Sequence, residues 1–253
     1  MMGNKIAIIT GASRGLGKST ALHLARQGVD IIGTYHSRDQ EARSVVEEIE
    51  ALGGKAKMLQ LDVGDSSLFE NFATQVSALL RAYFKAERFD FLVNNAGIGL
   101  YASCAETTEA QFDQLMNVHF KGPFFLTQKL LPLIANGGRI VNISSGLARF
   151  SPVGYAAYAS MKGAIEVWTR YLANELGPRD ITVNSLAPGA IETDFGGGTV
   201  RDNPEVNAWI SSNTALGRAG LPDDIGAAVS MLLGEGGGWI TAQRIEASGG
   251  MFI

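Results

Sequence analysis

The segment Thr10–Gly17, with the sequence TGASRGLG, decides the fold of this chain. An apolar run, Ile6–Thr10, leads into it, and a stretch with helical periodicity, Gly17–Gln27, follows it. Glycines at such a turn let the backbone bend sharply and approach a phosphate group, whose charge meets the free N–H groups at the start of a helix. The segment therefore predicts a strand, a phosphate-binding turn and a helix, in that order.

A phosphate loop of the kind found in nucleotide hydrolases is a rival interpretation of this segment. Gly17-Lys18-Ser19 matches the end of that motif, which requires four residues between its two glycines. Here five residues separate Gly11 from Gly17, and Ala12 occupies the position of the required glycine. Nucleotide hydrolysis is therefore a distant alternative, and a dinucleotide is the favoured ligand.

Apolar strand-like runs alternate with helix-like stretches along the chain. The strand-like runs cover residues 6–10, 29–35, 57–61, 89–93, 139–143, 182–186 and 243–246. The helix-like stretches cover residues 17–27, 39–52, 66–86, 155–176 and 222–233, and two segments within 109–135 that separate near Gly122-Pro123. This alternation predicts an α/β fold, a single doubly wound (Rossmann) parallel sheet of about seven strands with helices on both faces. No break in composition divides the chain, so we expect one domain over residues 1–253.

The composition argues against several classes of function. The 253 residues carry a net charge of −4, whereas a protein that binds nucleic acid has a basic surplus. No apolar run is long enough to cross a membrane or to form a signal peptide, so we expect neither. Cys104 is the only cysteine, which favours a reducing, cytoplasmic location. The three histidines are dispersed, so no metal site is expected.

The end of the second strand-like run indicates which dinucleotide is bound. Enzymes that prefer NAD usually carry an acidic residue there, which binds the ribose 2′-hydroxyl. Residues 31–38 contain no acid, while Arg14, Ser37 and Arg38 offer cationic and hydroxyl donors for a 2′-phosphate. We therefore predict NADP as the cofactor, with His36 at its adenosine end.

Tyr158 and Lys162 stand at positions i and i+4 of a predicted helix. This spacing puts the two side chains on one face, with the ammonium close to the phenol. A phenol with a pKa of about 10 is a poor proton donor near neutrality unless its anion is stabilised. Lys162 and a positively charged nicotinamide ring have the sign that lowers the pKa of Tyr158. Ser145 follows the strand-like run 139–143, in a position to hydrogen-bond a carbonyl oxygen.

The order and spacing of these motifs closely resemble those of the short-chain dehydrogenase/reductase family, and within it the 3-oxoacyl-carrier-protein reductase-like branch. The resemblance extends from about Lys5 to Gly250, nearly the whole chain. The motifs that carry it are the glycine turn, Leu61-Asp62-Val63, Asn94-Asn95-Ala96-Gly97, Asn117, Ser145, Tyr158-x3-Lys162 and Pro188-Gly189-Ala190-Ile191-Glu192-Thr193.

The resemblance implies hydride transfer between NADPH and a carbonyl compound, or the reverse reaction on a secondary alcohol. Tyr158 would donate the proton, Ser145 would orient and polarise the carbonyl, and Lys162 would hold the nicotinamide ribose. Asn117 would anchor a water that leads from Lys162 to solvent. Asp62 would contact the adenine, and Ile191 and Thr193 would hold the nicotinamide carboxamide. The full expected cofactor-binding set is Gly11, Ser13, Arg14, Gly15, Leu16, Gly17, His36, Ser37, Arg38, Asp62, Val63, Asn95, Ala96, Gly97, Tyr158, Lys162, Pro188, Gly189, Ile191 and Thr193.

The substrate and the direction of reaction stay open. The branch implies reduction of a 3-oxoacyl thioester that is carried by an acidic carrier protein. Members of the branch tend to have basic residues at two positions where this carrier docks. This chain has Arg179 at one of them, but Asn136 replaces the basic residue at the other. An NAD(P)-dependent alcohol or sugar dehydrogenase is an alternative, as is a non-catalytic dinucleotide-sensing protein. The glycine-rich segment 195–215 is expected to form a lid over the substrate.

Three further features follow from the resemblance. The chain is expected to form a homotetramer or a dimer. Ala242 stands where the family usually has a glycine, and Ser248 stands where an aspartate often precedes Gly249-Gly250. Both substitutions lie outside the expected catalytic set.

Overall fold

Seven parallel strands form one sheet in the computed structural model, which describes residues 4–253. Their order across the sheet is β3-β2-β1-β4-β5-β6-β7, so the direction in which the chain adds strands reverses between β1 and β4. The fold prediction is thereby confirmed. The strands are β1 (Ile6–Ile9), β2 (Asp30–Tyr35), β3 (Ala56–Gln60), β4 (Phe89–Asn94), β5 (Ile134–Ile143), β6 (Thr182–Pro188) and β7 (Arg244–Ala247).

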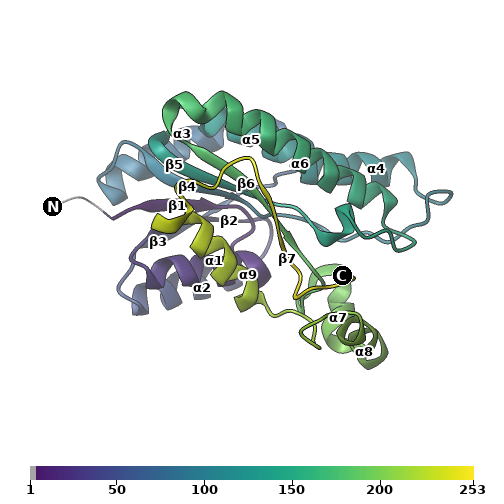
Figure 1. The fold of residues 1–253 in the computed structure, drawn as a ribbon. Coiled ribbons are helices and arrows are strands. Elements are labelled where there is room, and N and C mark those ends of the chain that lie inside the picture. The colour runs from purple at the N-terminus through teal and green to yellow at the C-terminus, as the bar shows by residue number, and fades with distance from the viewer. Residues whose placement is uncertain (1–3) are drawn as a thin grey trace.

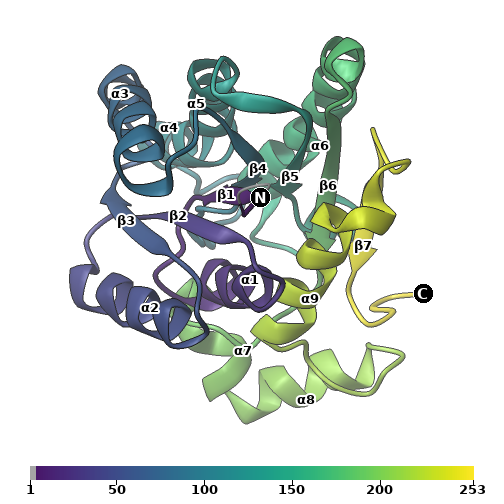
Figure 2. The ribbon, with the colours of Figure 1, turned by 90° about the vertical axis from the view of Figure 1, so that its left-hand side faces the viewer.

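Helices cover both faces of the sheet (Figure 1, Figure 2). One face carries α1 (Gly15–Arg26), α2 (Asp39–Ala51) and α9 (Pro222–Leu233). The other carries α3 (Phe69–Leu79), α5 (Gly122–Leu130) and α6 (Ala156–Leu176), with α4 (Glu109–Met116) packed against α6. Two short helices, α7 (Thr199–Asp202) and α8 (Pro204–Ser212), lie beyond the carboxyl end of β6 (Figure 1).

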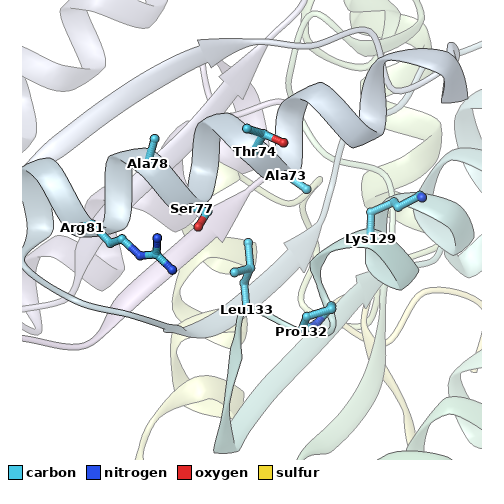
Figure 3. Close-up of a pocket in the computed structure, with 8 residues that line it drawn as sticks. All are labelled: Ala73, Thr74, Ser77, Ala78, Arg81, Lys129, Pro132 and Leu133. Carbon is cyan, nitrogen blue, oxygen red and sulfur yellow. The ribbon is translucent and has the colours of Figure 1, made fainter.

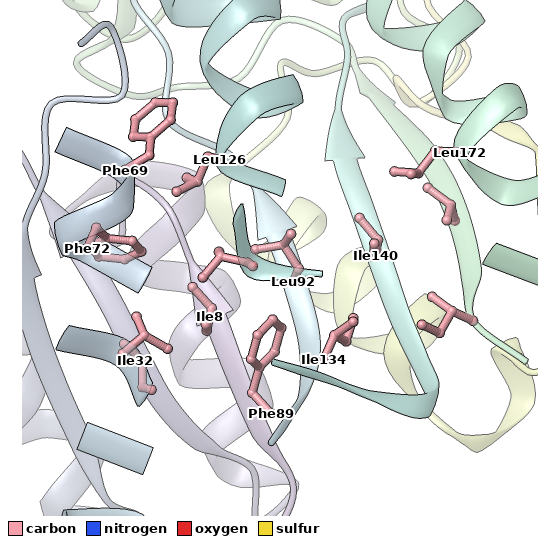
Figure 4. Close-up of a cluster of buried hydrophobic side chains, with 14 of the residues drawn as sticks. Ile8, Ile32, Phe69, Phe72, Phe89, Leu92, Leu126, Ile134, Ile140 and Leu172 are labelled. Carbon is pink, nitrogen blue, oxygen red and sulfur yellow. The ribbon is translucent and has the colours of Figure 1, made fainter. Parts of the chain in front are cut away.

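The central strands are buried on both faces, as a parallel sheet between two helical layers requires. All four residues of β1 are buried, and so are the last four of β4. Their side chains divide between two apolar clusters, one on each face of the sheet. Figure 4 shows the cluster in which Ile8, Leu92 and Leu126 meet. Complete burial of one such side chain contributes about 1.5–3 kcal/mol, so these clusters hold the strand ends in fixed positions.

Two expected helices differ from those observed. The segment 109–135 forms α4 and α5, joined without a break by a π-turn at Asn117–Lys121, and its helical part ends at Leu130. The expectation that helix continues to Ala135 is wrong, because Ile134 pairs with Phe89 and starts β5. The segment 66–86 is likewise interrupted, since a π-turn at Leu80–Phe84 follows α3.

Ala242 has a left-handed backbone conformation, with φ of 60°. Its N–H donates to the Val183 carbonyl at 2.8 Å, which holds the turn that enters β7 against β6. A Cβ atom in this conformation costs about 1–2 kcal/mol. The structure thus gives a physical reason for the glycine that the family usually has at this position.

Ala242→Gly is expected to raise the midpoint of thermal unfolding by about 2–4 °C for each kcal/mol of relieved strain. The same substitution at Ala78, an exposed residue of α3, should lower the midpoint, because glycine costs about 0.5–1 kcal/mol inside a helix. Differential scanning calorimetry of the two variants measures both shifts. A lower midpoint for Ala242→Gly would contradict the assignment of strain to this residue.

Candidate active site

The glycine turn lies at the carboxyl end of β1, where the strand order reverses. Gly11 and Gly15 have positive φ, 67° and 54°. A Cβ atom on Gly17 would lie 2.2 Å from the Gly11 carbonyl oxygen, so no side chain fits there. Ligands of open parallel sheets bind at the carboxyl ends of the strands where the order reverses. The turn has the tight backbone packing that the sequence predicted.

The start of α1 is suited to an anionic ligand. Arg14 occupies the N-cap position, makes no side-chain cap hydrogen bond, and no acidic residue stands in the first turn. The first N–H groups of a helix carry a partial positive charge and need acceptors. A pyrophosphate group supplies such acceptors, so the turn and the helix fit a dinucleotide.

Hydrogen bonds join the glycine turn to the turn after β4. Thr10 Oγ1 accepts from the N–H groups of Asn95 and Ala96, both at 3.0 Å. Asn95 Nδ2 donates in return to the carbonyls of Thr10 and Gly11, at 2.8 and 3.1 Å. The predicted cofactor residues Asn95–Gly97 therefore lie beside the glycine turn. Thr193 also lies next to the glycine turn, because its Cγ2 atom is 3.7 Å from the position that a Cβ atom on Gly15 would take.

Charged side chains gather at the expected adenosine end. His36 Nε2 lies 3.6 Å from Asp62 Oδ2, and Asp62 also accepts from the N–H of Gly64. Arg38 pairs with Glu41 at 2.6 Å, and the exposed Arg14 pairs with Asp194 at 3.1 Å. The pKa of Arg38 is raised, mainly by its hydrogen bond to Glu41 and to a smaller degree by the charge of Asp194.

Asp194 thus acts on both arginines that were predicted to bind a 2′-phosphate. Both pairs are solvent-exposed ion pairs, which contribute little to stability. The guanidinium groups are therefore available to exchange a carboxylate for a phosphate.

Tyr158, Lys162 and Ser145 come together at the carboxyl end of β5. Their exposed fractions are 7%, 4% and 9%. Lys162 Nζ donates to the Ile143 carbonyl at 2.7 Å and lies 5.7 Å from the centre of the Tyr158 ring. Ser145 lies two residues after Ile143, the last residue of β5. Its Oγ accepts a hydrogen bond from the N–H of Leu147 at 3.2 Å.

The pKa values differ from the expected ones. Burial raises the pKa of Tyr158 to about 12, although the nearby Ser145 hydroxyl acts in the opposite direction. Burial also lowers the pKa of Lys162 to about 7. Loss of hydration penalises the phenolate, and the charge of Lys162 is not among the causes of this shift. The lowering of the pKa of Tyr158 by Lys162 together with a bound nicotinamide ring stays a prediction.

Asn117 is the first residue of the π-turn between α4 and α5, which packs against α6. A Cβ on Gly122 would lie 2.8 Å from the Asn117 carbonyl oxygen and 2.1 Å from that of Val63, so the turn closes tightly on its neighbours. Single π-turns within helices are frequent at functional sites. The role of Asn117 in proton transfer stays a prediction.

His119 lies in the same π-turn and was not assigned to the site from the sequence. It is 1% exposed, and its ring meets the Tyr158 ring edge to face, with 5.0 Å between the ring centres. Burial lowers the pKa of His119 to about 3, with a further contribution from the charge of Lys162. No motif marks this histidine, and only the three-dimensional packing brings it to Tyr158.

The remaining predicted residues follow β6. A Cβ on Gly189 would lie 2.9 Å from Ser248, so the end of β6 packs closely against the segment after β7. Ile191 forms an isolated bridge with Gly220, and the N–H of Phe195 donates to Thr193 Oγ1 at 3.2 Å. These contacts fix the segment that contains Ile191 and Thr193, and Thr193 is the residue of it that lies next to Gly15 of the glycine turn.

A surface hollow between α3 and the end of α5 contains none of the predicted site residues (Figure 3). It is lined in part by Ser77, Lys129 and Leu133. Within residues 4–253, no group of three or more His, Cys, Asp and Glu side chains is arranged to hold a metal ion. None of the helices that the structure describes is both long and apolar enough to span a bilayer.

Known proteins resemble this chain over nearly its whole length. The sequence model of the family described as enoyl-(acyl carrier protein) reductase matches residues 11–252. An uncharacterized oxidoreductase of Methylorubrum extorquens is 37% identical to this chain. The match covers 98% of this chain and 97% of the length of that protein. The hydroxynaphthalene reductase-like protein Arp2 of Metarhizium robertsii is 33% identical, over 97% of this chain and 94% of its own.

A solved structure agrees with these matches. The angucycline C-6 ketoreductase LanV with bound NADP has a TM-score of 0.93 and 36% identity, covering 99% of this chain and 97% of that protein. The sheet order, the glycine turn and the grouping of Ser145, Tyr158 and Lys162 are consistent with these similarities. The chain therefore belongs to the short-chain dehydrogenase/reductase family, and it has the fold of an oxidoreductase that acts on CH–OH and C=O groups.

Proposed function

We propose that this protein is an NADPH-dependent ketoreductase that reduces a ketone to a secondary alcohol. The observation that carries the proposal is the grouping of Tyr158, Ser145 and Lys162 beside a turn that fits a dinucleotide. The NADP bound in LanV supports the choice of cofactor. The test is oxidation of NADPH, followed by its absorbance, with a panel of cyclic aromatic ketones, a 3-oxoacyl thioester, sugars and simple alcohols in both directions.

Bound NADPH would supply the hydride that reduces the carbonyl carbon. Ser145 Oγ holds the carbonyl oxygen, and the Tyr158 hydroxyl donates a proton to that oxygen. Burial raises the pKa of Tyr158, so the phenol is protonated near neutrality, and its anion has to be stabilised as the proton leaves. The positive charges of Lys162 and of a bound nicotinamide ring would have the sign that stabilises it. Lys162 Nζ gains and releases a proton near neutral pH, since its pKa is about 7, and it can hold the ribose hydroxyls at the same time.

Aromatic side chains near Tyr158 favour a flat, apolar substrate. The Phe195 ring centre lies 5.9 Å from that of Tyr158, and Phe195 is 42% exposed. Tyr101, 69% exposed, meets Tyr155 edge to face at 5.4 Å. Aromatic rings bind planar ring systems by stacking and edge contacts. We therefore propose a ketone on a fused ring system, as the names of Arp2 and LanV also suggest.

Arg179 gives no support to an acyl-carrier substrate. Its Nε donates to Asn136 Oδ1 at 3.0 Å, and its other two nitrogens donate to the carbonyls of Leu131 and Ile134. All three nitrogens are thus bonded to the segment that runs from the end of α5 into the start of β5. The two positions expected to dock a carrier protein bond to each other, so a 3-oxoacyl thioester is the weaker candidate.

The segment 195–215 is proposed as the lid over the substrate. Gly196, Gly197 and Gly198 all have positive φ, a left-handed conformation that side-chain-bearing residues rarely adopt. Asp194, just before them, binds both Arg14 and Arg201, at 3.1 and 2.7 Å. The lid is thereby attached to the cofactor turn at its base.

Association of the chain with itself is supported by the surface of α5 and α6. Phe125, Val167 and Tyr171 are exposed by 39%, 46% and 67% on this layer. Exposed apolar side chains that gather on one face mark interaction surfaces. We propose a homotetramer or dimer in the cytoplasm, which light scattering after size-exclusion chromatography tests.

Tyr158→Phe should retain NADPH binding and lose turnover by about 10²–10⁴-fold, because only the donated proton is removed. Fluorescence titration measures the binding, and NADPH oxidation measures the turnover. Tyr171→Phe removes an exposed hydroxyl from the same helix and should leave both quantities unchanged. Near-normal turnover of Tyr158→Phe would exclude this phenol as the proton donor.

Arg14→Ala and Arg38→Ala should each lower kcat/KM for NADPH by about 10- to 150-fold, since a charge-assisted hydrogen bond contributes about 1.5–3 kcal/mol. The value for NADH should hardly change, because NADH lacks the 2′-phosphate. Arg43→Ala, at an exposed arginine of α2 outside the cofactor set, is the control. Equal losses with NADH and NADPH would overturn the assignment of NADP.

Lys162→Met should change how stability depends on pH. The unfolded chain holds a proton on Lys162 up to a pH of about 10.5, whereas the folded chain releases it near 7. Between these values the unfolded state binds more protons, so the contribution of Lys162 to stability rises with pH. The free energy of unfolding of the wild type, minus that of Lys162→Met, should therefore increase from pH 7 to about pH 9.

Urea unfolding of both proteins at the two pH values measures this difference. Lys129→Met, at a surface lysine of α5, serves as the control for loss of an amine. A difference that is constant or that falls as the pH rises would contradict the lowered pKa of the buried Lys162.

A further inference from the structure

His119 is the one buried histidine of the described chain that contacts the proposed catalytic groups, and the proposed mechanism does not use it. Its Nε2 lies 2.8 Å from the Ile98 carbonyl oxygen and 3.2 Å from the Ile98 nitrogen. We assign the proton to Nε2, which then donates to the carbonyl at the shorter distance; in the other tautomer Nε2 accepts from the Ile98 N–H. The imidazole ring of His119 is also in edge-to-face contact with the phenol ring of Tyr158. His119 therefore connects the turn after β4 with the phenol.

The unpaired ring nitrogen makes a purely structural role costly. Nδ1 of His119 is buried, and no donor among residues 4–253 reaches it. A buried polar atom without a partner costs about 1–3 kcal/mol. Phenylalanine or methionine would fill a similar volume without an unpaired ring nitrogen, but would give up the contact with the Ile98 backbone. A histidine here is thus better explained by what its Nε2–H group does.

The fit around the ring is tight on the cofactor side as well. A Cβ on Gly97 would lie 2.8 Å from His119 Cε1, so the imidazole fills the space that a side chain at 97 would need. Residues 95–97 belong to the expected cofactor set. A shift of His119 therefore moves either this turn or the Tyr158 ring, because interiors are close-packed.

We propose that His119 is a positioning residue, which fixes Tyr158 relative to the cofactor turn through its Nε2–H···O=C hydrogen bond to Ile98. The inference rests on the proposed ketoreductase reaction. The titratable groups of α6 that face the ring are Tyr158 and Lys162, and Tyr155 acts on Tyr158 from the preceding helical turn. His119 itself stays neutral at working pH, so it acts by geometry and not by charge.

Three substitutions separate positioning from simple packing. His119→Gln keeps an N–H donor at the reach of Nε2, His119→Asn is too short to reach Ile98, and His119→Phe keeps an aromatic ring without a donor. Positioning predicts that kcat falls in the order His, Gln, then Asn and Phe, with the last two lower by about tenfold or more. The KM for NADPH should change little.

The free energy of unfolding should follow a different order. Phe, the most apolar replacement, should be at least as stable as Gln, because it buries more apolar surface and no polar side-chain atom at this position. Turnover and stability would then rank Phe and Gln oppositely. If kcat of the Phe variant equals or exceeds that of the Gln variant, or if kcat merely follows stability, the proposal is overturned. If Phe fails to fold, His119→Met takes its place in the same comparison.

A second readout does not depend on turnover. The ultraviolet titration of Tyr158 is obtained as the difference between each protein and the same protein carrying Tyr158→Phe. His119→Gln should keep the wild-type titration, and His119→Phe should shift it; identical titrations would overturn the proposal. Lys121→Gln, an exposed residue of the same π-turn, is the control. Absence of wild-type turnover on every ketone would instead refute the proposed function, and the titration would still decide the role of His119.

Discussion

The arrangement of the candidate site depends on the hydrogen bond between Lys162 Nζ and the Ile143 carbonyl. An ammonium group with an exposed fraction of 4% cannot be hydrated and must find acceptors within the protein. The last residue of β5 supplies one, which fixes the rotation of α6 about its axis. Tyr158, one helical turn earlier, then faces the same edge of the sheet as Ser145.

This contact also explains how two opposite pKa shifts arise in one place. The same burial that makes the Tyr158 phenolate unfavourable makes the Lys162 ammonium unfavourable. Each group is therefore closer to its neutral form than it would be in water. Burial alone therefore opposes release of the Tyr158 proton, so the proposed reaction depends on the positive charge that a bound nicotinamide ring would add.

The sequence predicted the parts of the site that depend on local spacing. The spacing of the glycines predicted the tight turn, and the packing at Gly17 agrees with it. The spacing of Tyr158 and Lys162 predicted that both side chains lie on one face of a helix. The seven-stranded sheet followed from the alternation of apolar runs. These features need no knowledge of residues distant in the chain.

Features that depend on packing between distant segments could not be predicted. The pairing of Arg14 with Asp194 joins residues 180 positions apart, and no pattern around either residue signals it. The raised pKa of Tyr158 depends on how completely α6 and the π-turn exclude water. The end of α5 at Leu130 belongs here too, because Ile134 pairs with Phe89, a residue 45 positions away in the chain.

The close approach of His119 to Gly97 links the amino-acid choices at two positions that are 22 residues apart. Related chains with a bulkier residue in place of Gly97 need a smaller ring or an aliphatic side chain in place of His119. An alignment of homologues should therefore show the two columns changing together.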